Sequence, residues 1–149
     1  MSDASVPVEL PHPPPVEDER ASAKFELFLA MLLGVTATAL LYFVRTGDWL
    51  LGSLFFIFGN IGFAGSLVYY DALLPHVAKP NEIDQVSSRG YAMGYIGGGL
   101  LLLVNVAMIF LGPQLLPNMA EADATKLMMR LSLASVAVWW AIFSIPIFR

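Results

Sequence analysis

The sequence has no cysteine, few charged side chains, and long stretches with no charge at all. Without cysteine, the 149-residue chain can form no disulfide, carry out no thiol chemistry and build no thiolate metal site. Only 13% of the residues are charged, and the net charge of -4 argues against nucleic acid as a partner. The chain has two histidines and no cluster of acidic residues, so we expect no metal site, no cofactor and no enzyme active site.

The sequence is rich in hydrophobic residues. Apolar residues make up 57% of it, and its mean hydropathy is +0.68. The excess lies in four apolar runs, at about residues 25–44, 49–70, 91–112 and 127–148. Each run has about the 20 residues that a helix needs to cross a bilayer. We therefore predict an all-α integral membrane protein with four transmembrane helices in region 25–149, which makes the lipid bilayer its first partner.

The segments outside these runs are predicted from proline and charge. Residues 1–24 combine several prolines with a charged run at 17–20, and we expect a disordered tail. Four residues separate the first two runs, which forces an antiparallel hairpin. Residues 71–90 form the longest loop, in which Pro75 ends regular structure and Asn81 is the expected N-cap of a short helix on the membrane surface.

The distribution of basic residues predicts an orientation. With four spans, both chain ends and the 71–90 loop lie on one side of the membrane. That side carries five basic residues and the other carries three: Arg20, Lys24, Lys79, Arg89 and Arg149 against Arg45, Lys126 and Arg130. Because cytoplasmic segments are enriched in lysine and arginine, both termini are predicted to be cytoplasmic.

Glycine is concentrated at the start of the third run. Gly90, Gly94, Gly97 and Gly98 share a helical stripe about 100° wide. Small residues let another helix backbone approach closely in lipid, so we predict that this stripe packs against a helix. Whether it only holds a bundle together or forms a moving interface stays open. A dinucleotide-binding loop is rejected, because no strand precedes these glycines and no helix start follows them.

Small residues also line one face of the first run, which should therefore have a neighbour as well: Ala30, Gly34, Ala37 and Thr38. In the second run, Asn60 falls near the middle of the membrane, where an amide needs a partner. It either lines a polar pathway or makes a hydrogen bond between helices. Trp139 also falls mid-membrane, and faces either the bundle or the lipid.

Several stretches carry a resemblance to a known family. Residues 58–63, 69–75, 83–98 and 139–146 resemble the fourth, fifth and sixth spans of the vacuole-effluxer-like branch of the major facilitator superfamily. The resemblance implies a secondary transporter of about twelve helices in two six-helix halves. Region 25–149 would supply the third through sixth helices of the first half. The activity named for that family is export of amino acids from the vacuole.

If the resemblance holds, the chain is a truncated or split piece of a transporter for a small solute, in the bacterial inner membrane. A second polypeptide, or the missing helices, would complete it. Asn60, Asn105 and Trp139 are then the candidates to line the substrate cavity, and Asp71 and Arg89 could pair at the cytoplasmic gate. The alternative is a scaffold or accessory subunit that transports nothing and assembles through its glycine faces.

Overall fold

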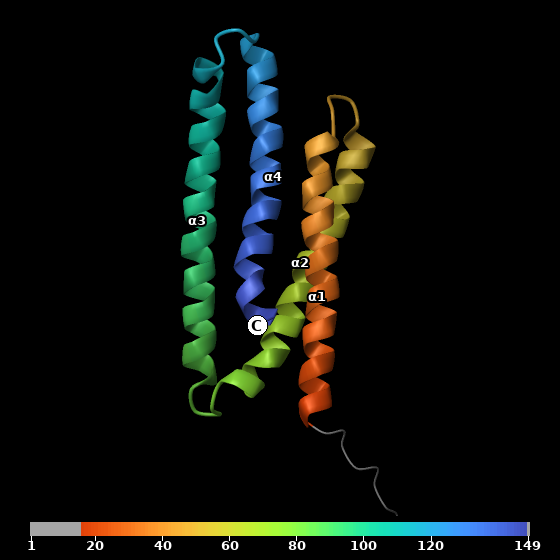
Figure 1. Ribbon diagram of the computed structural model, residues 1–149, viewed down its shortest axis with the longest axis vertical. Coiled ribbons are helices and arrows are strands. Elements are labelled where there is room, and N and C mark those ends of the chain that lie inside the picture. The colour runs from red at the N-terminus through yellow and green to blue at the C-terminus, as the bar shows by residue number, and fades with distance from the viewer. Residues whose placement is uncertain (1–15, 149) are drawn as a thin grey trace, which may run out of the picture.

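The computed structural model describes residues 16–148, which form four long α-helices and one short 3-10 helix (Figure 1). In chain order these are α1 (Val16–Leu40), η1 (Leu41–Phe43), α2 (Trp49–Val77), α3 (Ile83–Leu115) and α4 (Glu121–Phe148). All four α-helices are long and apolar enough to cross a membrane. The predicted all-α membrane fold is therefore confirmed.

The helices are arranged as two antiparallel hairpins (Figure 1). α1 and α2 form one hairpin, α3 and α4 form the other, and α4 also packs against α1. The turn from α1 into α2 is closed by the backbone N–H of Asp48, which donates to the carbonyl of Arg45 over 3.0 Å. Gly47 makes this turn possible, because its φ of 102° lies in the left-handed region that side chains disfavour.

The helices extend beyond the predicted spans. α1 begins at Val16, so residues 16–24, which we expected in the disordered tail, are helical; residues 1–15 lie outside the described part. α2 continues past Pro75 to Val77, and α4 begins six residues before residue 127. Hydropathy detects the part of a helix that lies in lipid, whereas hydrogen bonding along the backbone carries the helix on into water.

The connection between α2 and α3 is the clearest correction. The predicted loop 71–90 is reduced to residues 78–82, and no separate surface helix forms there. Residues 83–90 instead form the first turns of α3. Glu82, not Asn81, is the N-cap, and its side chain makes no capping hydrogen bond. A helix of 33 residues is about 50 Å long, which exceeds the hydrocarbon thickness of about 30 Å, so α3 projects into water.

Among residues 16–148, two helix backbones come into direct contact where α1 packs against α2. A Cβ atom added to Gly62 would lie 2.5 Å from the Cα of Gly34 and 2.7 Å from the carbonyl oxygen of Ala30. The two backbones therefore touch at this point. Gly34 is equally close to α4, because a Cβ there would clash with the ring of Trp140. Both α2 and α4 therefore pack against the small-residue face that was predicted on the first run.

The outer surface is apolar, as a membrane protein requires. Large hydrophobic side chains are exposed on the outside of every helix, among them Trp49, Tyr95 and Phe110. In water such a surface would mark an interaction site or an aggregation hazard. Around transmembrane helices the same surface faces lipid.

Candidate substrate cavity and gate

A cavity of about 620 Å³, open on one side, lies between the four α-helices. Asn60 from α2, Gly94 and Gly98 from α3, and Trp139 from α4 all contribute to its wall. The rest of the wall is mostly apolar and aromatic: Thr38, Leu41, Phe55, Phe56, Gly59, Phe63, Leu101, Leu133, Val136, Trp140, Phe143 and Ser144. Two of the three predicted cavity residues are therefore brought together with two glycines of the predicted stripe.

Asn60 supplies the amide group of this wall. Its Nδ2 donates to the carbonyl of Phe56, one turn earlier in α2, over 2.8 Å. Its Oδ1 accepts no hydrogen bond from residues 16–148 and is free to accept one from a solute or from water. Asn60 lies about 17 Å along α2 from Trp49, which places it near the middle of a bilayer about 30 Å thick.

Trp139 faces the bundle and not the lipid alone. Its ring stacks obliquely on Phe143, with the ring centroids 4.4 Å apart. A methyl group at Gly97 would lie 3.9 Å from the indole, in ordinary van der Waals contact. Trp139 therefore lies beside Gly97 between α4 and α3, at a distance that would also accommodate an alanine.

Asn105, the third predicted cavity residue, has a different position. It is buried between α3 and α4, where its Oδ1 accepts a hydrogen bond from the hydroxyl of Ser135 over 2.8 Å. Asn105 is not part of the cavity wall. Asn105 therefore forms a hydrogen bond between α3 and α4 instead of lining the cavity. Ser135 lies one turn before Trp139 on α4, but no spacing within α4 pairs it with a residue of α3.

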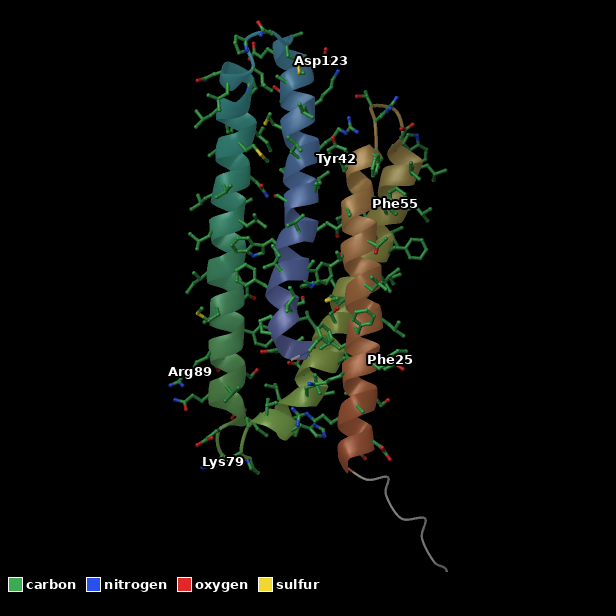
Figure 2. All side chains as sticks on the ribbon, in the orientation of Figure 1. Phe25, Tyr42, Phe55, Lys79, Arg89 and Asp123 are labelled. Atoms are coloured by element: carbon green, nitrogen blue, oxygen red, sulfur yellow. The ribbon has the colours of Figure 1, made fainter. Side chains whose placement is uncertain are left out.

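The two gate candidates do not pair in this structure. Within residues 16–148 the only ion pair joins Lys126 to Asp123, over 3.4 Å on the surface of α4. Asp71 instead accepts a hydrogen bond from the hydroxyl of Tyr91 over 3.3 Å. Arg89 lies nearly two helical turns into α3 and projects away from α2 (Figure 2). The pair was expected across the 71–90 loop, but both residues lie in helices and only residues 78–82 connect them.

The predicted glycine stripe on α3 is only partly occupied. Gly90 lies against the hydroxyl of Tyr70, and Gly97 lies against Trp139. A Cβ added to Gly94, Gly98 or Gly99 would meet no atom of residues 16–148 within 4 Å. Close helix packing in this chain therefore depends on Gly34 and Gly62, while the middle of the α3 stripe is open.

Comparison with known proteins agrees with this architecture. The profile of the family described as "Vacuole effluxer Atg22 like" matches residues 18–83 and 81–149, which together hold all four α-helices. The chain belongs to the vacuole effluxer Atg22-like family. The two matched segments of this Atg22-like protein meet at the short connection between α2 and α3.

A curated relative places the family within the major facilitator superfamily. The Atg22-like chain is 36% identical over 117 residues to the "Uncharacterized MFS-type transporter YxiO" of Bacillus subtilis (strain 168). The match covers 78% of this chain and 26% of the relative, so the chain spans about a quarter of the relative's length. No solved structure matches it. The predicted resemblance is confirmed, and this integral membrane protein is a piece of a facilitator-type transporter fold.

Proposed function

We propose that the Atg22-like chain takes part in moving a small solute across the membrane, and that the solute passes through the cavity between α2, α3 and α4. The observation that carries this proposal is the unpaired Oδ1 of Asn60 in a largely apolar wall near mid-membrane. Facilitators bind their substrates near the bilayer midplane. A volume of about 620 Å³ also lies in the range of small-molecule sites, about 300–1,000 Å³.

The proposal requires helices beyond these four. Facilitator cavities lie between two halves of the protein, and this chain matches a quarter of its relative. The open glycines Gly94 and Gly98 offer a surface that the backbone of a further helix can approach. We infer that a second polypeptide, or the remaining helices of the transporter, closes the open side of the cavity next to these glycines and leaves the cavity itself to the solute. The alternative of a scaffold that transports nothing gains no support from membership in a transporter family.

Asp71 and Arg89 keep a proposed role at the gate. Both lie at the end of the bundle where α2 joins α3, the same end at which α1 begins (Figure 1). Because they are unpaired here, an ion pair between them would belong to another conformation of the transporter. With the five-to-three bias of basic residues, this end is proposed to be the cytoplasmic one.

The test measures solute movement in the presence and absence of the chain. Inverted vesicles are prepared from the native host and from a strain lacking the gene, and are given a mixture of radiolabelled amino acids, the class named for the family. We expect uptake in the first vesicles only, and we expect Asn60→Leu to abolish it. Ile61→Leu is the matched control, because Ile61 is exposed on the outside of α2 and should leave transport unchanged.

Two results would overturn the proposal. One is equal uptake with and without the gene for every amino acid in the mixture. The other is normal uptake by Asn60→Leu, since the cavity wall would then lack its polar group and still serve transport.

A further inference from the structure

A second cavity, of about 510 Å³, lies at the opposite end of the bundle from the proposed gate. It is formed by the turn between α1 and α2 on one side and by α4 on the other. Its polar wall consists of Arg45, Thr46, Lys126 and Arg130, and its apolar wall consists of Leu41, Val44, Met129 and Leu133. Three cationic side chains and no carboxylate line this cavity, which we call the basic cleft.

Arg130 is held in place before any ligand arrives. Its Nε donates a hydrogen bond to the carbonyl of Tyr42, and its guanidinium carbon lies 4.5 Å from the centre of the Tyr42 ring. Tyr42 belongs to η1, which follows α1 and packs beside α4 (Figure 2). The two Nη groups of Arg130 donate to no other group in residues 16–148. Two donors of a half-buried, oriented guanidinium therefore remain for an anion, and this fork suits phosphate geometry.

The nearby carboxylates do not cancel this charge. Asp123 contacts Lys126 over 3.4 Å, but both side chains are largely exposed and such pairs are weak. The Oδ2 of Asp48 accepts the backbone N–H of Arg45 over 3.2 Å, within the turn itself. Neither carboxylate reaches the wall of the basic cleft. The cleft therefore presents an excess of positive charge.

The depth of the basic cleft matches the membrane surface. From Arg130 to Phe148, α4 rises about 27 Å, close to the hydrocarbon thickness of about 30 Å. A span of this length that starts at Arg130 leaves the first turns of α4 outside the hydrocarbon. In Figure 1 the connection between α3 and α4 extends further than the turn between α1 and α2. Within the cleft, Leu133 lies one turn deeper than Arg130, and Leu41 lies one turn deeper than Arg45. Cations thus lie at headgroup level, with apolar residues below them.

We propose that the basic cleft binds one anionic phospholipid, with its phosphate on Arg45, Lys126 and Arg130 and an acyl chain against Leu41 and Leu133. A phospholipid has the same order of groups along the membrane normal, a charged phosphate above an apolar chain. Free phosphate shares the charge but has nothing to place on the apolar wall. The basic cleft shares Leu41 and Leu133 with the wall of the solute cavity, but its three cations lie outside that wall, so the lipid site does not rest on the proposed transport.

The experiment measures lipid affinity by native mass spectrometry. The tagged full chain is extracted from its own membranes with any polypeptide that stays bound, stripped of lipid in detergent, and titrated with dioleoyl phosphatidylglycerol or dioleoyl phosphatidylcholine. We expect phosphatidylglycerol to bind more tightly, in one high-affinity copy. The double variant Arg45→Gln/Lys126→Gln should lose about 30-fold in affinity for it, the equivalent of about 2 kcal/mol.

The double variant leaves Arg130 and its contacts with Tyr42 intact, so the cleft should keep its shape. The matched control is Lys24→Gln/Lys79→Gln, which removes two charges at the other end of the molecule, where Figure 2 shows Lys79. It should bind phosphatidylglycerol as the unchanged protein does. Equal affinity for the two lipids, equal losses in both double variants, or displacement of the lipid by millimolar inorganic phosphate would each overturn the proposal, the last in favour of a free-anion site.

Discussion

The contact between Gly62 and Gly34 predicts that the smallest possible side chain at position 62 will separate α1 from α2. An added Cβ would lie 2.5 Å from the Cα of Gly34, whereas carbon atoms pack at about 3.5–4.0 Å. Relief therefore requires a movement of about 1 Å. The obstacle is backbone on both helices, so no rotation of a side chain can absorb it.

The loss of stability in Gly62→Ala can be estimated from the van der Waals contacts that this movement weakens. A gap of about 0.5–1 Å forfeits roughly a quarter to a half of the dispersion energy of each atom pair along the seam. Overpacking of this kind costs about 1–3 kcal/mol, and we expect Gly62→Ala to fall at the upper end. Gly112→Ala should cost less, since its added Cβ meets only the flexible side chain of Met128. Gly99→Ala is the matched control, because its Cβ would meet nothing within 4 Å in residues 16–148.

The assay is unfolding of the purified chain by sodium dodecyl sulfate in mixed micelles, followed by tryptophan fluorescence. Trp140, one of three tryptophans, packs on Gly34 next to the altered contact, so part of the signal comes from the seam. We expect Gly99→Ala to be the most stable of the three variants, Gly112→Ala to be less stable, and Gly62→Ala to be the least stable. Equal stability of Gly62→Ala and Gly99→Ala would refute the reasoning, because the α1–α2 contact would then not depend on the missing side chain.

Three further predictions concern polar contacts and use the same unfolding assay. Ser135→Ala should cost about 0.6–2 kcal/mol by removing the hydrogen bond to Asn105, and a double-mutant cycle with Asn105→Leu should show that the two losses are not additive. Arg130→Met should destabilise by about 1–3 kcal/mol, since it removes both the hydrogen bond and the cation–π contact to Tyr42; an unchanged midpoint would contradict this. Asp123→Asn should change stability by less than about 1 kcal/mol, and by nothing at high salt, because it removes only an exposed ion pair.

The fold was predictable because lipid imposes a simple rule. Every backbone polar group in the hydrocarbon must be satisfied within its own segment, so a long apolar run without charge can only be a helix. This rule located four spans and their hairpin order. It could not locate helix ends such as Val16 or Val77, because they lie beyond the apolar runs, and Pro75, which removes one backbone hydrogen bond, does not end α2.

The candidate site was predictable only in part. Asn60 and Trp139 were identified because each is unusual at mid-membrane, and the structure places both on one cavity wall. Asn105 is equally unusual, but its partner is Ser135, and a sequence does not reveal which helix faces which. The contact between Gly62 and Gly34 could not be predicted for the same reason. Gly62 is one of several glycines in the second run, and only the structure shows that it is the one that contacts Gly34.

The use of glycine connects these observations to the proposed partner. A glycine inside a helix costs about 0.5–1 kcal/mol relative to alanine unless a close approach compensates. Gly34 and Gly62 have that compensation within the chain, because their backbones touch. Gly94 and Gly98 have none within residues 16–148, yet they lie one turn apart on the wall of the solute cavity. A surface built in this way favours an occupant from outside the four helices, either a further helix backbone or the solute. Substituting Gly98 with leucine should therefore abolish transport while leaving the α1–α2 seam, and hence the unfolding midpoint of the isolated chain, unchanged.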